Sequence, residues 1–193
     1  MAVLATLMSE KTVSHPHVDF SHLIIRKVKN EDLSFLEWDG EFLKFRRMYA
    51  SIYRDSLLGK TLMWLVELLP GEIIGQAFVM LWGGGKGLAD GKEHAYMFSF
   101  RVKPQWRNFG IGSYLMNFIE NDLIERRYKY LTLNVARENP DALRLYERLG
   151  YRILHATPGD WSYVDHEGNL QYVHEPAWRM IKALSQPSVK SQK

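Results

Sequence analysis

The stretch PQWRNFGIGSYL, residues 104–115, places Arg107, Gly110 and Gly112 between an expected strand and an expected helix. The glycines let the chain turn tightly and let a ligand approach the backbone without obstruction by a side chain. The helix that follows offers unpaired N–H groups and the positive end of its dipole. With the charge of Arg107, these features suit a pyrophosphate. A plain strand-to-helix turn explains the same residues, so this stretch alone leaves both interpretations open.

Apolar patterns on either side of this stretch predict alternating strands and helices. Expected strands are Leu23–Val28, Thr61–Leu69, Ile73–Trp82, Tyr96–Val102, Leu131–Val135, Tyr151–His155 and Ala177–Leu184. Expected helices are a short one from Glu31 capped by Asn30, one over Glu41–Leu58, one from Gly110 or Ile111, and one capped by Asn139 that begins at Pro140 and ends at Gly150. Mixed strands with interspersed helices predict an α/β or α+β layered domain.

The composition is that of one globular domain. We expect the domain over residues 22–185, a flexible leader over 1–21 and a polar tail over 186–193. The net charge of +3 and pI of about 9.0 suit an anionic ligand. The basic residues are scattered, so nucleic-acid binding is not expected. Apolar runs are too short to span a membrane, and we expect a cytoplasmic protein.

The chain contains no cysteine, which excludes disulfides, thiolate nucleophiles and cysteine-based zinc sites. Its seven histidines lack the spacing of metal ligands. We therefore expect no metal site.

A second motif lies one helix and one strand further along the chain. It reads NPDALRLYERLGY, from Asn139 to Tyr151. Combined with Arg107-x-x-Gly110-x-Gly112, it resembles the GNAT superfamily of acyl-CoA N-acyltransferases. The resemblance is specific over 96–151 and looser in the strand order before and after.

The resemblance implies a mixed, mostly antiparallel central sheet with flanking helices and one splayed pair of parallel strands, Tyr96–Val102 and Leu131–Val135. Acetyl-CoA would lie where these two strands separate. Phe100 and Val102 are implied to bind the pantetheine arm. The pyrophosphate would be bound by Arg107, Asn108, Phe109, Gly110, Ile111, Gly112 and Ser113, and Asn139 would face the cofactor. Tyr146 would protonate the departing thiolate, and a homodimer is possible.

The implied reaction is direct attack of a primary amine on the thioester of acetyl-CoA, with a small-molecule amine as the expected acceptor. An alkyl amine has a pKa of about 10 and must lose a proton before it attacks. No covalent enzyme intermediate is needed, in agreement with the missing cysteine. Alternatives are acetylation of a protein N-terminus or lysine, a non-catalytic acyl-CoA sensor, and a phosphate-binding protein that matches the motifs by chance.

Three points stay open on the sequence alone. Tyr146 shares a helix face with Ala142 and Leu149, so it could be a core tyrosine instead of a general acid. The general base is not identified, and the candidates are Tyr96, Ser99, Glu93, His94, Glu67 or a water chain. The aromatic and acidic segment Pro158–Pro176 could border a site for a cationic amine or could form a hairpin turning at 165–169.

Overall fold

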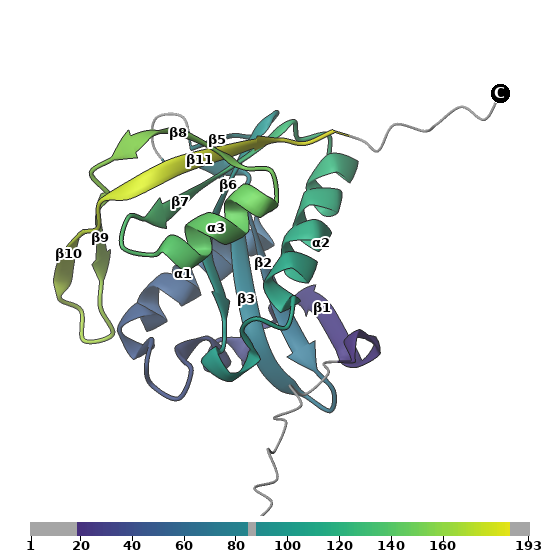
Figure 1. Cartoon of the computed structure of the whole chain (residues 1–193). Helices are drawn as coiled ribbons and strands as arrows, with labels where there is room; N and C mark the ends of the chain where they lie inside the picture. Colours follow the sequence, from purple (N-terminus) through teal and green to yellow (C-terminus); the bar gives the residue numbers. More distant parts are fainter. Residues whose placement is uncertain (1–18, 85–87, 186–193) are drawn as a thin grey trace, which may run out of the picture.

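The computed structural model of the chain describes residues 19–84 and 88–185. A seven-stranded sheet runs through the molecule (Figure 1). Its order is β1 (Leu23–Lys27), β2 (Thr61–Leu68), β3 (Glu72–Met80), β6 (His94–Val102), β7 (Tyr130–Ala136), β11 (Ala177–Ala183) and β8 (Arg152–Thr157). Every neighbouring pair is antiparallel except β6 and β7, which are parallel. The prediction of a mixed, mostly antiparallel sheet with one parallel pair is confirmed.

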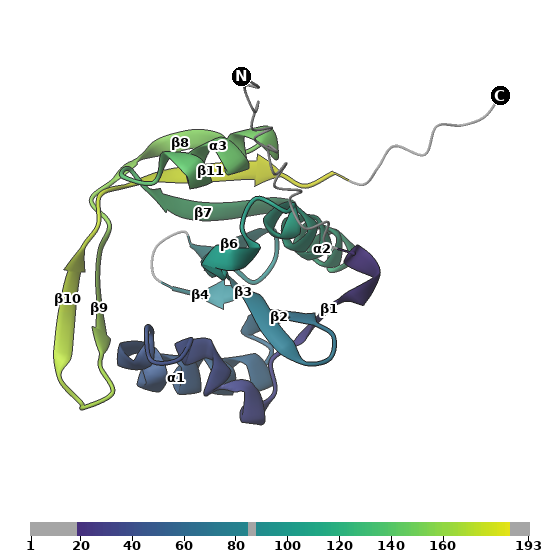
Figure 2. The same cartoon turned by 60° about the horizontal axis from the view of Figure 1, so that its bottom comes forward.

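Helices cover both faces of the sheet (Figure 2). One face packs against α2 (Ile111–Glu125) and α3 (Pro140–Arg148), and the apolar stripe of α2, which includes Leu115 and Ile119, is buried there. The other face packs against α1 (Arg46–Leu57), where Tyr49 meets Phe78 of β3. Because both faces are covered, β2 and β3 are buried along most of their length.

The chain between β1 and α1 differs from the expected pair of helices. It forms three short 3-10 turns, η2 (Asn30–Asp32), η3 (Phe35–Glu37) and η4 (Leu43–Phe45). Asn30 is not the cap, because the Asp32 carboxylate accepts the Lys29 N–H at 2.7 Å. α1 begins at Arg46 instead of Glu41 because Leu43–Phe45 form the 3-10 turn η4, and Phe42 before it has a non-helical ψ of 21°. Here the predictions of a cap at Asn30 and a helix start at Glu41 were wrong.

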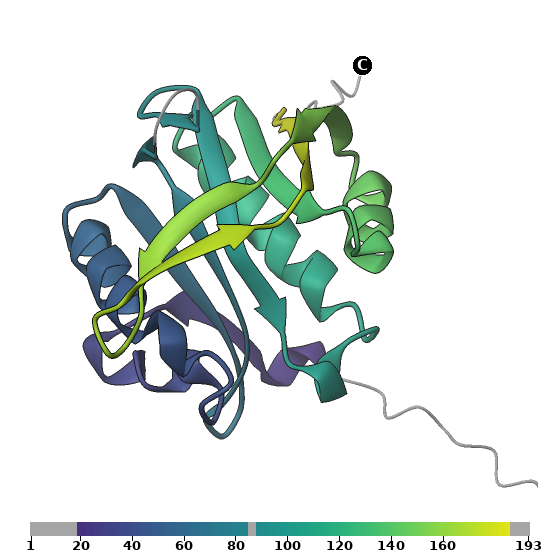
Figure 3. The same cartoon turned by 90° about the vertical axis from the view of Figure 1, so that its left-hand side faces the viewer.

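A hairpin joins β8 to β11, formed by β9 (Asp160–Val164) and β10 (Leu170–His174). It extends across the face of the sheet that carries α1, and its tip reaches α1 (Figures 2 and 3). There Arg47 Nε donates to the His166 carbonyl at 3.3 Å, and the Phe45 ring packs against Trp161 and Tyr163. The hairpin interpretation of this segment is therefore confirmed.

Smaller elements complete the described chain. They are η1 (Phe20–His22), η5 (Pro104–Trp106), and the paired strands β4 (Trp82–Gly83) and β5 (Ala89–Asp90). The Phe20 ring lies edge-on against Tyr114 of α2, with ring centroids 5.2 Å apart. Most of the expected leader and all of the expected tail at 186–193 lie outside the described residues. Within the described ranges, no helix combines the length and hydropathy that a membrane span requires.

Candidate active site

The two parallel strands separate part-way along their length. Hydrogen-bonded pairing joins residues 94–97 of β6 to residues 130–133 of β7 and ends there. Beyond that point β6 continues to Val102 and β7 to Ala136. Phe100 and Val102 lie in this open half of β6, where the strand edge facing β7 is left for a ligand. The predicted splay between these strands is present.

A bulge in β6 accompanies the separation. Gln76 of β3 lies opposite Arg101 and Phe78 lies opposite Phe98, so Ser99 and Phe100 together face a single residue of β3. Ser99 takes a left-handed conformation with φ of 50°. A bulge bends the strand that contains it and increases its twist. This bend turns the end of β6 away from β7.

The loop before α2 presents a row of backbone donors. The N–H groups from Asn108 to Ser113 hydrogen-bond to nothing in the described chain, and the first helical bond runs from Tyr114 N to Gly110 O at 2.9 Å. Asn108 and Gly110 have positive φ angles of 67° and 83°. Phe109 and Ile111 pack into the core and hold the loop in place. Unpaired donors at the positive end of a helix form a site that suits phosphate groups.

The side chains of Arg107 and Ser113 flank this loop. Arg107 Nε donates to the Val102 carbonyl at 3.0 Å, which ties the loop to the open end of β6. Its terminal nitrogens make no hydrogen bond within residues 19–84 and 88–185. Arg107 is exposed and Ser113 is half-buried. The structure thus brings the predicted phosphate-loop residues together at the end of β6.

Gly112 has a different role from Gly110. A Cβ atom at Gly112 would lie 3.4 Å from the Phe100 ring and 3.6 Å from a methyl group of Leu145 on α3. Both distances are ordinary van der Waals contacts, so the packing of α2 against β6 and α3 leaves room for a methyl group at this position. Gly110, by contrast, occupies the left-handed N-cap position of α2, which glycine adopts without strain.

α3 begins and ends as predicted. The Asn139 side chain accepts the Ala142 N–H at 3.0 Å, Pro140 is the first helical residue, and Gly150 follows the helix with φ of 88°. The side-chain oxygen of Asn139 caps the helix, and both N–H groups of its side-chain amide are left for a ligand. Asn139 itself is exposed.

Tyr146 on α3 is a core residue, as one of its two interpretations expects, and its catalytic role stays a prediction. Its ring is buried between Phe100 and Tyr151, with centroids 6.1 and 5.8 Å away. No hydrogen bond to its hydroxyl is found in the described part of the chain. Burial, with a smaller contribution from the nearby Tyr96, raises the pKa of Tyr146 well above its usual value. The hydroxyl therefore carries its proton at neutral pH, as a general acid must.

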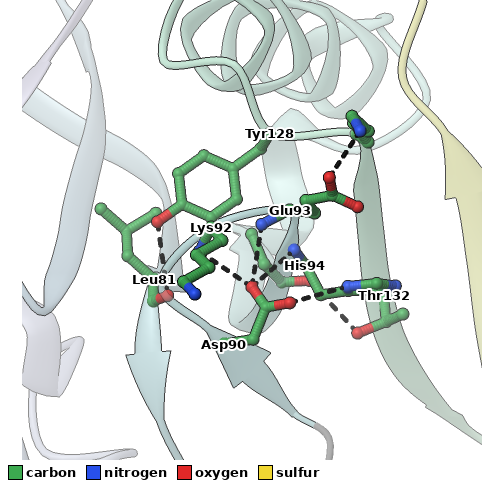
Figure 4. A network of polar contacts seen from close by, with 9 residues as sticks. Leu81, Asp90, Lys92, Glu93, His94, Tyr128 and Thr132 are labelled. Carbon is green, nitrogen blue, oxygen red and sulfur yellow. Dashed lines mark hydrogen bonds and ion pairs between the residues drawn. The ribbon is translucent and has the colours of Figure 1, made fainter.

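Most candidate bases lie away from the open strand ends. Glu67 is bound to Arg26 at 2.5 Å on β2. Glu93 pairs with Lys129, and His94 pairs with Asp90 at 3.0 Å, at the opposite end of β6 from the splay (Figure 4). The N–H groups of residues 92–94 also converge on the Asp90 carboxylate, so this network anchors the start of β6. Of the candidates, Tyr96 and Ser99 lie beside the splay.

Two arginines that the sequence did not single out lie on the α1 side of the sheet. Arg101 follows the bulge in β6, and its Cζ lies 3.9 Å from the centroid of the Phe42 ring. Arg179 of β11 lies over the Tyr96 ring at 5.0 Å, and its Nε donates to Asn134 Oδ1 at 2.5 Å. The sequence holds no signal for this grouping, because it depends on which strands are neighbours.

Comparison with known proteins agrees with this geometry. Residues 26–151 match the family model of the acetyltransferase (GNAT) family. The chain belongs to this family. It is therefore an acetyl-CoA-dependent N-acetyltransferase. A GNAT relative, an uncharacterized N-acetyltransferase of Methanocaldococcus jannaschii, is 30% identical over 136 residues, which is 67% of this chain and 78% of the relative.

Solved structures share the fold of this acetyltransferase. Spermidine N-acetyltransferase from Vibrio cholerae in complex with CoA and spermine has a TM-score of 0.62 at 18% identity, covering 85% of this chain and 96% of that chain. A ribosomal-protein alanine N-acetyltransferase from Escherichia coli has a TM-score of 0.63 at 18% identity, and the match covers 87% of this chain and 97% of that chain. At this identity the likeness concerns the fold alone.

Proposed function

We propose that this N-acetyltransferase transfers the acetyl group of acetyl-CoA to the primary amine of a small molecule by direct attack on the thioester. The observation that carries this proposal is the row of unpaired N–H groups from Asn108 to Ser113, next to the open ends of β6 and β7. A pyrophosphate on that row would leave the pantetheine arm to lie along the open edge of β6.

The cofactor is bound mainly by backbone in this proposal. The pantetheine arm pairs with Phe100 and Val102, and the Arg107 side chain and the amides that follow it hold the pyrophosphate. The exposed amide nitrogen of Asn139 faces the cofactor across the splay. The apolar residues of the loop hold it rigidly, so its donors are already oriented before the ligand arrives.

The reaction then needs few side chains. The neutral amine attacks the carbonyl carbon, and a backbone N–H at the open end of β6 stabilises the oxyanion. As the C–S bond breaks, Tyr146 gives its proton to the thiolate sulfur, while the nitrogen loses its own proton to solvent. The products are the amide and free CoA. The phenol regains its proton from water.

The hairpin favours a small acceptor over an extended peptide. Its strands cross the α1 side of the sheet. Its tip is bound to α1 through Arg47, and its strand β9 packs against Phe45 of η4. A polypeptide that lay across this face would have to displace these contacts. Tyr96 and Phe98 are only half-buried beneath it, so a small molecule can reach them.

Tyr146→Phe tests the proposed general acid. The variant keeps the ring packing, so acetyl-CoA should raise its Tm as much as it raises that of the wild type. Turnover, followed as CoA release, should fall about 100-fold or more because proton donation is lost. Unchanged turnover would exclude the role of Tyr146. A chain whose Tm does not respond to acetyl-CoA would contradict the whole proposal.

The acceptor class is tested with the wild-type enzyme. A panel of small amines should support CoA release, whereas a matched panel of peptides should support little. Release with peptides alone would show a protein acceptor instead. Acetyl-CoA binding without release on either panel would show a sensor.

A further inference from the structure

The α1 side of the splayed strands has a positive charge at its centre. Tyr96, Phe98 and Arg101 of β6 lie opposite Met80, Phe78 and Gln76 of β3, so all three point to the face covered by α1. Arg101 is half-buried, between the ring of Phe42 and the hydroxyl of Tyr49. This face is where an acceptor would approach the thioester from the side opposite α2 and α3.

Arg101 has no carboxylate partner among residues 19–84 and 88–185. Its one hydrogen bond runs from Nη1 to the Tyr49 hydroxyl at 2.9 Å, which leaves Nε and Nη2 unused. Glu37, whose charge reaches the Tyr49 hydroxyl, is already bound by Arg46 through two hydrogen bonds of 2.6 and 2.8 Å. A half-buried guanidinium without an anion is unusual, because buried charges are normally paired.

A buried amide next to Arg101 also lacks a partner. Gln76 is 0% exposed, and neither atom of its amide group makes a hydrogen bond of acceptable geometry in the described chain. It lies close enough to the Tyr49 hydroxyl to influence its pKa, which burial raises and Arg101 and Gln76 partly lower. An unsatisfied buried amide is costly. Gln76 thus leaves polar capacity on the residue that lies opposite Arg101 in the strand pair.

Two acidic residues of the hairpin segment are used within the hairpin itself. Asp165 accepts N–H groups from residues 167–169 and from the Gln171 amide, so it forms the turn of the hairpin. Asp160 pairs with His174 at 2.5 Å and is largely exposed. A second cation, Arg179, lies over Tyr96 and hydrogen-bonds only to the neutral Asn134 within the described ranges. Glu175 is exposed and its charge reaches Tyr96, so this face holds one carboxylate against two guanidiniums that no carboxylate pairs within the described ranges. The balance of charge therefore favours an acceptor with an anionic group.

We propose that the acceptor is an amine that also carries a carboxylate, and that Arg101 binds this carboxylate. The planar guanidinium offers the paired donors that a carboxylate accepts. Arg101 follows the bulge directly, within about 7 Å of Ser99 along the strand. An amine at the bulge and a carboxylate at Arg101 are thus close enough to belong to one amino acid. This inference rests on the proposed small-molecule acetyl transfer.

The wild-type enzyme provides the first test, through three acceptors that differ only at the carboxylate. Phenylalanine carries it, phenylalaninamide neutralises it, and phenethylamine lacks it; the aromatic ring suits the phenylalanine side chains around Arg101. We expect kcat/KM for phenylalanine to exceed that of the other two by about 10- to 100-fold, the value of a charge-assisted hydrogen bond. Spermidine, which is only cationic, should be the poorest acceptor.

Variants of Arg101 provide the second test. Arg101→Gln should lower kcat/KM for phenylalanine to within about threefold of the kcat/KM for phenethylamine. Most of this loss should appear as a higher KM for phenylalanine. It should leave the Tm increase caused by acetyl-CoA unchanged. Arg101→Lys, which retains the charge without the fork, should retain part of the preference. The matched control is Arg54→Gln, an exposed arginine of α1, which should behave like the wild type.

The outcomes separate this inference from the proposed function. Acetyl transfer to phenethylamine or spermidine in preference to phenylalanine would overturn the inference and leave acetyl transfer intact. A loss of acetyl-CoA binding in Arg101→Gln would overturn it too, because Arg101 would then serve the cofactor. If no small amine releases CoA although acetyl-CoA binds, the small-molecule proposal itself fails.

Discussion

At the scale of single residues, the two glycines of the proposed cofactor loop differ in what the fold demands of them. Gly110 has φ of 83°, in a region where an L-residue is strained. Gly112 lies within α2, and a Cβ atom there would meet the Phe100 ring at 3.4 Å, an ordinary van der Waals contact. Backbone conformation thus requires glycine at 110, whereas the fold alone would accept alanine at 112.

Substituting each glycine by alanine should separate these requirements. Gly110→Ala should lower the free energy of unfolding by about 1–2 kcal/mol, the cost of left-handed backbone at a residue with Cβ. Gly112→Ala should leave it unchanged or raise it by up to about 1 kcal/mol, because the methyl group fits at ordinary contact distance and alanine has the higher helix propensity. Urea unfolding of both variants measures the difference. An equal loss of unfolding free energy in both variants would show that the left-handed backbone at Gly110 does not explain the need for glycine there.

At the scale of elements, the β9–β10 hairpin depends on one carboxylate. Asp165 Oδ1 accepts the Asn169 N–H at 2.8 Å, the Gly168 N–H at 2.9 Å and the Glu167 N–H at 3.0 Å. The Asn169 N–H contributes most to lowering the pKa of Asp165, to about 2. Because the folded pKa lies below the ordinary value of about 3.9, this stabilisation is fully present above pH 4. It is lost as the pH falls toward 2.

Asp165→Ala should loosen the hairpin without affecting the cofactor loop. The tip of the hairpin contacts α1 beside the proposed acceptor face. A loosened hairpin would order this face less well, so we expect a several-fold higher KM for the acceptor. The Tm increase caused by acetyl-CoA should not change, since the loop at 107–113 lies on other elements. Steady-state kinetics with both substrates tests this. An equal rise in KM for acetyl-CoA would refute the separation of the two sites. Asp160→Ala, at an exposed position of the same hairpin, serves as the control.

At the scale of the whole molecule, the sheet separates the proposed cofactor site from the proposed acceptor site. The cofactor loop and Tyr146 belong to the side covered by α2 and α3, and Arg101 belongs to the side covered by α1. A buried polar cluster joins elements on the first side. Glu120 of α2 accepts from Tyr151 Oη at 3.0 Å and from Lys182 Nζ of β11 at 2.6 Å, and it is only 7% exposed.

Lys182→Met should therefore destabilise the fold as a whole. Removing one partner of a buried pair leaves an uncompensated charge, and we expect a loss of about 3 kcal/mol in the free energy of unfolding. Adding Glu120→Gln should recover much of that loss. Lys129→Met, which breaks the exposed pair with Glu93, should cost less than about 1 kcal/mol. Equal effects of the two lysine variants would show that the Glu120 cluster contributes no more than a surface pair.

The cofactor half of the proposed site was predictable because it is local in sequence. The phosphate loop and the helix of Tyr146 are each one continuous stretch, and caps, glycine conformations and helix periodicity act over only a few residues. The segment between β1 and α1 was predicted less well. There the contact of Asp32 with Arg26, set by strand packing, overrode local propensity.

The sequence alone therefore determined the family, the sheet and the proposed place of acetyl-CoA. Only the tertiary structure decided the acceptor side. Arg101 and Tyr49 are 52 positions apart, and Arg179 and Asn134 are 45 apart. Whether a charged side chain is paired depends on which strands lie side by side and which loops fold over them. That information exists only after the chain has packed, because burial and pairing are properties of neighbours in space.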